Sequence, residues 1–442
     1  MSTPLCFEDK VEGYDEDSLP PLGLGYIATS LQKHGLSVEL HDAVASNKPV
    51  SDIIRQINVS GVRTVGLNVF TTNLHLVRKI VEGVSVPVQF ILGGLSTKSI
   101  YGEIFEWETS NSIDIVMGDG EIIMPDLVNG CECEPPVMSS DTDGRRRRYF
   151  SVDSNSHYYV NDINGVDLNR SFFSHEPIHH PVHGIVEANI VATRGCIYNC
   201  AFCSAAKSKN KHMGVRERSP VNIKKEVLEL KDFYEGLSSV RVLDDLFLKN
   251  RGSVENAIKI FEGTDLSWRA MAHVGSFRNV NEELLKRLKE SGCLELFIGI
   301  ESGSQKMLKM IHKTHNLDLI SKTITKILNS GISVKGFFIY GFPGETEEDC
   351  EDTFRLASSL KESSDKSDGD FRTSVFRFRP YHGTELYDLV SDSGTNDVVH
   401  RDLPLSHLKR RQQFNFATQN YSACSDEIIA HYISVTDQLN DR

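Results

Sequence analysis

The feature that most constrains this chain is a group of three cysteines, Cys196, Cys200 and Cys203, within eight residues. The preceding residues, 185–193, are rich in β-branched side chains and predict a strand, so the cysteines follow its carboxyl end. In parallel α/β folds the loops at that end carry the chemistry. Three thiolates can hold a [4Fe–4S] cluster and leave one iron open to another ligand. A structural zinc site needs four ligands, and this region has no fourth cysteine nearby.

The cysteine loop, with Phe202 beside its last thiol, resembles the signature loop of the radical S-adenosylmethionine (SAM) superfamily. The resemblance implies that the open iron chelates the methionine part of SAM. It also implies that one electron from the reduced cluster cleaves SAM and yields a 5′-deoxyadenosyl radical. The less specific interpretation is a zinc knuckle or a set of buried free thiols, since short cysteine patterns also arise by chance.

Downstream of the cysteines, strands alternate with helices, and six such units predict a partial (β/α)6 TIM barrel over residues 185–390. Residues at the ends of these strands resemble SAM-binding positions of the superfamily. The resemblance implies that Asp244 accepts a hydrogen bond from SAM's amino group. It implies that Glu301 binds the ribose, whose two neighbouring hydroxyls are donors that one carboxylate can accept. The full set of implied SAM contacts is Phe202, Asp244, Glu301, Gly341, Pro343 and Arg379.

The first part of the chain predicts a Rossmann-like open parallel sheet, because strands alternate with helices and end in glycine or small polar residues. Strands are expected at residues 38–41, 64–70, 86–92 and 113–118. Residues 19–127 resemble the cobalamin-binding domain that precedes many radical SAM cores. The loop positions that carry this resemblance, and that it implies as cobalamin contacts, are Pro21, Leu22, Thr71, Thr72, Asn73, Gly93, Gly94, Gly118 and Glu121.

Two features depart from the cobalamin-binding family. The Asp-x-His-x-x-Gly element that gives a histidine to cobalt in mutases is absent, and Leu95 follows the paired glycines where the family usually has a proline and a histidine. The alternative interpretation is that the glycines at the strand ends serve the turns alone. The domain would then act as a scaffold or a substrate lid.

The expected domain boundaries are residues 1–130, an irregular linker at 131–184, the barrel at 185–390 and a helical extension at 391–442. In the linker, Cys131 and Cys133 predict a surface loop more than a metal site. The run Arg145–Arg148 predicts a solvated charge cluster, with a clamp for an anionic ligand as the alternative. Four histidines near the barrel are interpreted as packing residues rather than metal ligands: His175, His179, His180 and His183.

Composition limits the cellular setting and the partners. The net charge of −13 gives no general attraction to nucleic acid. No apolar run is long enough to cross a bilayer, and the amino end lacks a basic start followed by an apolar core. Nine cysteines, an odd number, without a secretion signal argue against a disulfide framework. We therefore expect a cytoplasmic protein.

The favoured function is an enzyme in which a SAM-derived radical activates a C–H bond of a small molecule and cobalamin carries a methyl group to that carbon. A low-potential donor such as flavodoxin or ferredoxin would reduce the cluster. The alternative is radical chemistry without methyl transfer: rearrangement, epimerisation, cyclisation or sulfur insertion. Methylthio transfer to RNA is disfavoured, because it would need three more cluster cysteines and Cys6 alone precedes Cys131. A non-catalytic iron–sulfur sensor is a third class, and it predicts loss of the SAM contacts.

Overall fold

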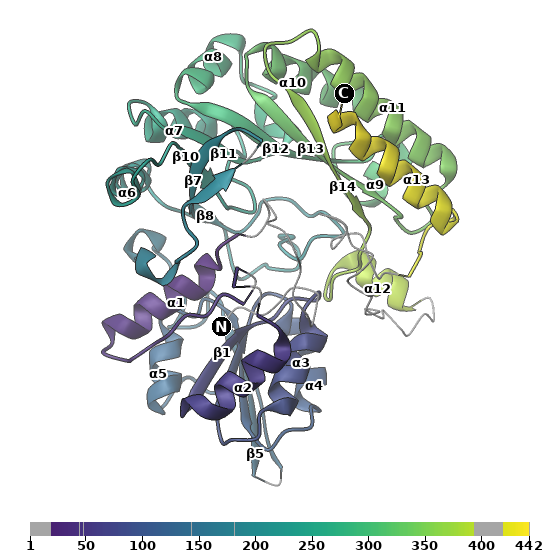
Figure 1. Ribbon diagram of the computed structural model, residues 1–442. Coiled ribbons are helices and arrows are strands. Elements are labelled where there is room, and N and C mark those ends of the chain that lie inside the picture. Colours follow the sequence, from purple (N-terminus) through teal and green to yellow (C-terminus); the bar gives the residue numbers. More distant parts are fainter. Residues whose placement is uncertain are drawn as a thin grey trace.

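The computed structural model describes residues 19–43, 45–46, 48–142, 144–180, 182–392 and 419–441. This part of the chain forms two α/β units, each built on its own sheet (Figure 1). The amino-terminal unit is purple to blue in the figure, and the larger carboxyl-terminal unit is teal to yellow. Loops of both units lie between the two sheets.

The amino-terminal sheet, as far as it is described, has five strands in the order β1-β2-β3-β5-β4. Neighbouring strands are parallel except in the β4–β5 hairpin. The strands are β1 (Thr64–Asn68), β2 (Gln89–Gly93), β3 (Ser112–Gly118), β4 (Met138–Thr142) and β5 (Arg145–Val152). The helices are α1 (Leu22–Lys33), α2 (Val50–Ser60), α3 (Leu74–Gly83), α4 (Thr97–Phe105) and α5 (Ile123–Asn129). The predicted Rossmann-like parallel sheet is confirmed.

The strand predicted at residues 38–41 is wrong, because residues 36–41 belong to no strand of the sheet. Leu36 and Val38 instead pack against a core cluster that includes residues of α1 and α5, and Leu40 packs beside Leu22. A four-residue alternation also suits a loop that packs its apolar side chains onto neighbouring helices. The alternation of residues 38–41 alone therefore did not distinguish a strand from a packed loop.

The irregular linker predicted over residues 131–184 is wrong for residues 138–152, which form the β4–β5 hairpin and extend the first sheet. The arginine run is part of β5 rather than a fully solvated cluster. Arg147 is buried and donates to the carbonyl oxygens of Asn111 and Thr109 at 2.6 and 2.9 Å. Arg148 makes a two-pronged contact with buried Asp114, at 2.7 and 2.9 Å. Strand β5 was not predicted because its arginines are charged, and the groups that Arg147 and Arg148 bind lie elsewhere in the sequence.

The second sheet is a partial barrel, and in the described residues its strand order is β14-β13-β12-β11-β10-β7-β6. Six strands run parallel, and β6 (Ile178–His180) pairs antiparallel to β7. The parallel strands are β7 (Ile185–Ile190), β10 (Ser239–Val242), β11 (Ser267–Ala272), β12 (Cys293–Glu301), β13 (Ser333–Tyr340) and β14 (Phe371–Arg377). Strands β14 and β6 form the two edges and do not pair with each other, so the predicted open (β/α)6 architecture is confirmed.

Helices follow the barrel strands and cover their outer face (Figure 1). They are α6 (Pro220–Phe233), α7 (Arg251–Phe261), α8 (Glu282–Glu290), α9 (Gln305–Met310), α10 (Leu317–Asn329) and α11 (Glu347–Ser364). Their starts have a local cause: Asn281 caps α8 by accepting the Leu284 N–H, and Thr346 forms a capping box with Asp349 on α11. On α8 the apolar side chains recur at helical spacing and bury one face, formed by Leu284, Leu285 and Leu288.

The amino ends of the barrel strands enclose a buried group of charges. Arg269 on β11 donates to Glu187 on β7 at 2.8 Å and to Glu295 on β12 at 3.1 Å. All three side chains are nearly inaccessible to solvent. His183 contacts Glu295 from the linker at 3.4 Å. This packing fills the barrel near its amino ends, so the ligand space lies at the carboxyl ends of the strands.

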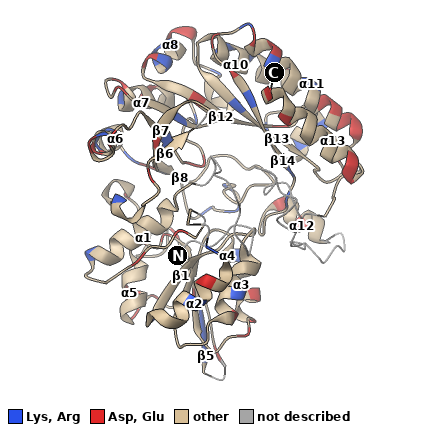
Figure 2. Ribbon diagram, in the orientation of Figure 1, with Lys and Arg blue, Asp and Glu red and all other residues tan. Residues whose placement is uncertain are grey.

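The predicted helical extension is confirmed in α13 (Asp426–Asp437), which packs against α11 and β14 (Figure 1, yellow). Helix α12 (Glu385–Asp392) precedes it. Acidic side chains gather on the outer helices α11 and α13 (Figure 2), in keeping with the net charge of −13. Residues Arg401, Lys409, Arg410 and Arg411 of the extension lie outside the described residues. Among the described helices, none combines the length and apolar character that spanning a bilayer requires.

Candidate active site between the two units

A cavity of about 1090 Å³ lies between the two units, at the carboxyl ends of both parallel sheets. This volume lies just above the roughly 300–1,000 Å³ typical of small-molecule pockets, so the cavity suits a large ligand. Its amino-terminal wall includes Pro21, Gly93, Gly94, Gly118 and Glu121, and its barrel wall includes Arg194, Gly195, Cys196 and Asp245. The structure thus brings part of the predicted cobalamin set to the same space as the first cysteine.

The cysteine loop is closed at its base by a small antiparallel ladder. Strand β8 (Thr193–Arg194) pairs with β9 (Arg216–Glu217), so residues 195–215 form one loop that begins and ends at the same place. Gly195 has φ +90°, and a Cβ there would lie 2.7 Å from the carbonyl oxygen of Gly214. A side chain would therefore push the two ends of the loop apart, and glycine is required at this position.

Four charged residues join this ladder to the amino-terminal unit. Arg194 contacts Asp119 at 2.9 Å and also forms an ion pair with Glu121. Arg216, which faces Arg194 across the ladder, donates to the same Asp119 at 3.2 Å. Asp119 further accepts the Val160 N–H at 3.1 Å. The loop after β3, predicted to contact cobalamin through Gly118 and Glu121, is therefore also the attachment point of the cysteine loop.

The three cysteines are free thiols at partly buried positions, and Cys196 lines the cavity. Burial raises the pKa of the Cys203 thiol to about 12, and it also raises the pKa of Cys200, which Lys313 opposes. Within the described ranges, no three His, Cys, Asp or Glu side chains converge as a single metal ion requires. A zinc ion would need all its sulfur ligands about 2.3 Å from one point, whereas cluster thiolates bind different irons. The number of these thiols and their place on one loop suit a cluster that three thiolates hold.

Glu301 lies at the end of β12 in a left-handed conformation, with φ +69°. Its carboxylate pairs with Lys313 at 3.1 Å, and both side chains are more than nine-tenths buried. Burial alone would lower the pKa of Lys313, but Glu301 and the nearby Cys200 raise it above its ordinary value. Gly299 makes room for the pair, since a Cβ there would lie 2.2 Å from the Glu301 carboxylate. Lys313 was not predicted from the sequence, because no strand-end pattern marks it.

The two acids after β10 face different surroundings. Asp244 is buried and accepts the Ala192 N–H at 2.8 Å, and burial raises its pKa to about 7. Its second oxygen has no hydrogen-bond partner among the described residues. The neighbouring Asp245 lines the cavity, and burial raises its pKa as well. The sequence analysis chose Asp244, and the structure adds Asp245 as the acid that reaches the cavity.

The predicted glycine-rich SAM loop after β13 does not line the cavity. Gly341 has φ +92°, and its N–H donates to the fully buried carboxyl group of Glu345, whose pKa burial raises to about 7. Phe342 brings this loop to the cysteines, because its ring centroid lies 6.0 Å from that of Phe202. Of the other two predicted residues, Pro343 is partly buried and Arg379 is buried.

The predicted Thr71–Asn73 turn serves contacts within the protein. Thr71 accepts the backbone N–H of His382 at 3.1 Å, from the loop after β14. Asn73 closes its own turn, accepting the Phe70 N–H at 2.7 Å and donating to the Asn68 carbonyl oxygen at 3.2 Å. None of Leu22, Thr71, Thr72 and Asn73 lines the cavity, although Asn68 and Phe70 do.

Two cavity glycines are required by the backbone itself. A Cβ at Gly94 would lie 2.3 Å from the Val69 carbonyl oxygen, and one at Gly118 would lie 2.0 Å from that of Val152. Both have positive φ, +136° and +104°. These glycines therefore serve the close approach of strand ends. The same lack of side chains leaves the cavity wall open to a flat ligand.

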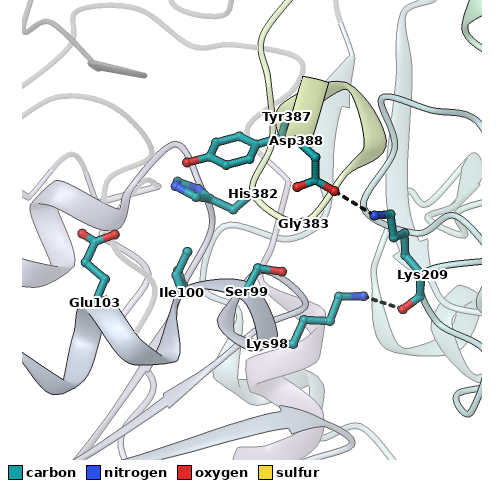
Figure 3. A pocket seen from close by; sticks show the side chains of 9 residues that line it. All are labelled: Lys98, Ser99, Ile100, Glu103, Lys209, His382, Gly383, Tyr387 and Asp388. Carbon is teal, nitrogen blue, oxygen red and sulfur yellow. Dashed lines mark hydrogen bonds and ion pairs between the residues drawn. The ribbon is translucent and has the colours of Figure 1, made fainter. Parts of the chain in front are cut away.

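A second pocket, of about 510 Å³, lies where α4 meets the loop before α12 (Figure 3). Lys98 donates to the carbonyl oxygen of Lys209 at 2.9 Å, and the Lys209 ammonium pairs with Asp388 at 3.0 Å. Ser99 lies against Gly383, where a Cβ would come within 2.1 Å of its hydroxyl oxygen. This pocket marks a second contact between the amino-terminal unit and the barrel.

The residues at the site fit the cofactors that the sequence implies. Three thiols on one loop form a donor set suited to an iron–sulfur cluster. The second oxygen of Asp244 is an acceptor that lacks a partner among the described residues, as an ammonium donor would require. The side-chain-free wall at Gly93, Gly94 and Gly118 faces the cysteine loop across the cavity.

Comparison with known proteins agrees with this arrangement. Residues 15–128 match the B12 binding domain family, and residues 190–357 match the Radical SAM superfamily. An uncharacterized methyltransferase of Pyrococcus horikoshii is 28% identical, over 84% of this chain and 78% of the relative. The cytidylyl-2-hydroxyethylphosphonate methyltransferase of Streptomyces wedmorensis is 26% identical, over 83% of this chain and 77% of that protein.

Solved structures share the fold over nearly the whole chain. The radical SAM methyltransferase TsrM of Kitasatospora setae, with cobalamin and a [4Fe–4S] cluster bound, has a TM-score of 0.63 at 15% identity and covers 94% of this chain and 88% of its own. The cobalamin-dependent SAM radical enzyme OxsB, with aqua-cobalamin and SAM bound, has a TM-score of 0.62 at 16% identity. It covers 95% of this chain and 64% of its own. With both domains matched, this chain carries a domain of the radical SAM superfamily and, ahead of it, a domain of the B12 binding family.

Proposed function

We propose that this protein is a cobalamin-dependent radical SAM methyltransferase that methylates a carbon of a small molecule. The observation that carries the proposal is the single cavity lined by both the strand-end glycines of the B12-binding domain and Cys196 of the cysteine loop. The two methyltransferase relatives, each matched over more than four-fifths of this chain, support methyl transfer over other radical outcomes. TsrM, also solved with tryptophan bound, supports a small-molecule substrate.

When bound, the reduced cluster and SAM supply a radical that abstracts hydrogen, and cobalamin supplies a methyl group. The chain's own contribution is to hold these groups and keep them in place. Cys196, Cys200 and Cys203 would hold the cluster. The loops at Gly93, Gly94 and Gly118 would receive cobalamin, with Pro21 on the same wall.

The SAM contacts proposed from the sequence are supported by the electrostatics of the site. Glu301 is held at the strand end by Lys313, so its carboxylate is oriented before any ligand arrives. The unpartnered oxygen of Asp244 and the carboxylate of Asp245 offer acceptors for an amino group. Phe202 and the Gly341 loop pack together behind the cysteines through Phe342.

Anaerobic reconstitution tests the proposal. We expect about four irons per chain, as a [4Fe–4S] cluster requires, and release of 5′-deoxyadenosine when SAM and a low-potential reductant are added. Cys200→Ala should abolish that release. Release by the variant, or zinc in place of iron, would contradict the assignment.

Cobalamin binding is tested separately from the cluster. Protein incubated with hydroxocobalamin and desalted should keep its absorption spectrum. With a low-potential reductant present to reduce the bound cobalamin by two electrons, SAM with a labelled methyl group should pass the label to it and leave S-adenosylhomocysteine. Protein that cleaves SAM but keeps no cobalamin would favour the radical reactions without methyl transfer. A donor such as flavodoxin or ferredoxin, and a cytoplasmic location, stay predictions from the sequence.

A further inference from the structure

Three lysines that follow the cysteine triad face two different spaces. Lys207 and Lys211 line the cavity between the units, whereas Lys209 lines the second pocket and pairs with Asp388. Figure 3 shows Lys209 directed at Asp388, on the side of α12. The first and third lysines are thus on the ligand side of this segment, and the middle one is on the other side.

The segment that carries these lysines is held in place by many hydrogen bonds. The Lys207 N–H donates to the Tyr198 carbonyl oxygen within the cysteine loop, at 2.8 Å. The Asn210 amide donates to the carbonyl oxygens of Ser204 and Ala206, at 2.7 and 2.9 Å, and its oxygen accepts from Lys98. The backbone that presents the two lysines is therefore fixed relative to the cysteines.

The charges on the cavity wall are not balanced on the barrel side. Asp119, Glu121, Arg194 and Arg216 neutralise one another through their ion pairs. Among the described residues, neither Lys207 nor Lys211 forms a hydrogen bond or ion pair through its ammonium group. The remaining acid on that wall is Asp245, next to Gly195. Two cations against one acid leave a net positive charge at this end of the cavity, although the chain as a whole carries −13.

We propose that Lys207 and Lys211 form a subsite for an anionic oxygen group of the substrate, such as a phosphate or phosphonate. Two ammonium groups on one fixed segment can bind such a group through charge-assisted hydrogen bonds. Because Cys196 lines the same cavity as these two lysines, an anion held there would leave the rest of the substrate in the space that Cys196 borders. This inference rests on the proposed function, which it deepens by naming a substrate class.

Cobalamin also carries an anionic group of this kind, the phosphodiester of its nucleotide tail. Dicyanocobinamide lacks that tail and therefore separates the two sources. A subsite for the substrate predicts that substituting the lysines leaves binding of both hydroxocobalamin and dicyanocobinamide unchanged. A subsite for the tail predicts weaker binding of hydroxocobalamin alone.

The test uses the full chain, reconstituted without oxygen and loaded with hydroxocobalamin, and methylphosphonate as the probe followed by ³¹P NMR. We expect saturable binding, weakened about tenfold for each lysine lost in K207Q and K211Q, as losing a charged hydrogen bond predicts. K209Q, on the same segment but facing the other pocket, should bind as the unsubstituted protein does. The double variant K207R/K211R, which keeps both charges, should retain binding.

Several results would overturn the inference. They are absence of saturable binding to the unsubstituted protein, equal binding by the double variant K207Q/K211Q, equal loss in K209Q, or loss of hydroxocobalamin but not dicyanocobinamide binding. The proposed function is judged on different readouts, release of 5′-deoxyadenosine and retention of cobalamin by the unsubstituted protein. Either proposal can therefore fail while the other stands.

Discussion

Asp119 and Arg194 join the two cofactor domains through an ion pair of 2.9 Å, although 75 residues separate them in the sequence. Arg194 directly precedes the cysteine loop, and Asp119 directly follows Gly118 on the cavity wall. Arg216 binds the same carboxylate from the other end of the cysteine loop. One buried aspartate therefore links both ends of the cysteine loop to the cavity wall that carries Gly118.

Replacing that aspartate tests its role. Asp119→Asn should destabilise the protein by about 3–5 kcal/mol, because the mostly buried guanidinium group of Arg216 loses the carboxylate that it pairs with and Arg194 keeps only Glu121. Thermal unfolding of the ligand-free protein measures this effect, and retention of hydroxocobalamin should fall with it. Asp52→Asn is the matched control, since it removes an exposed pair with Arg55 and should change stability by less than about 1 kcal/mol. Equal melting temperatures for the two variants would contradict the prediction.

Glycine at position 118 is required by the approach of two strand ends. Gly118→Ala should lower the free energy of unfolding, because its Cβ would lie 2.0 Å from a backbone oxygen that cannot move independently of β5. Gly102→Ala in α4 is the control, since nothing lies within 4 Å of its Cβ. Alanine there should stabilise the helix by about 0.5–1 kcal/mol. Urea unfolding measures the free energy of unfolding of both variants. A Gly118→Ala protein as stable as the Gly102→Ala protein would show that the strand ends can separate.

The pair formed by Glu301 and Lys313 should govern SAM binding. Lys313→Met leaves a buried carboxylate without its cation, which favours protonation of Glu301 and removes the acceptor proposed for the ribose. We expect the SAM concentration for half-maximal release of 5′-deoxyadenosine to rise at least about tenfold, the effect of losing one charged hydrogen bond. The iron content should be unchanged. Lys322→Met, which breaks an exposed pair with Asp318, serves as the control. An unaltered response to SAM in Lys313→Met would remove Glu301 from the proposed site.

Glu345 should make stability depend on pH. Burial raises the pKa of its carboxyl group to about 7 in the folded protein, from an ordinary value of 4.5. The folded state therefore holds this proton more tightly than the unfolded state, and stability falls as pH rises between these two values. Glu345→Gln removes the effect, so its stability relative to the unsubstituted protein should increase from pH 5 to pH 8, by up to about 3 kcal/mol.

Denaturant unfolding at the two pH values measures this difference. Glu351→Gln changes an exposed residue of α11, the helix that follows Glu345, and removes its pair with Arg355. It should show a stability difference from the unsubstituted protein that is the same at pH 5 and pH 8. A Glu345→Gln difference that is also independent of pH would mean that the carboxyl group titrates normally in the folded chain.

Local patterns predicted most of the fold. Six strand–helix units and a preceding parallel sheet were visible because periodic burial and glycine at strand ends repeat within short windows. The β4–β5 hairpin was missed because the arginines of β5 are satisfied by Asn111, Thr109 and Asp114 on or beside a neighbouring strand. The charged residues of β5 gave this strand a sequence like that of a surface loop.

The sequence by itself determined the kind of site, because three thiols at close spacing on a strand-end loop restrict the metal chemistry that they support. Only the tertiary structure decided which side chains share that site. Lys313 has no spacing that marks it, and the partners of Asp119, which are Arg194 and Arg216, lie 75 and 97 residues along the chain. Their roles follow from how the carboxyl ends of two separate sheets face one another, and that arrangement is set by packing and charge pairing between distant segments rather than by local periodicity.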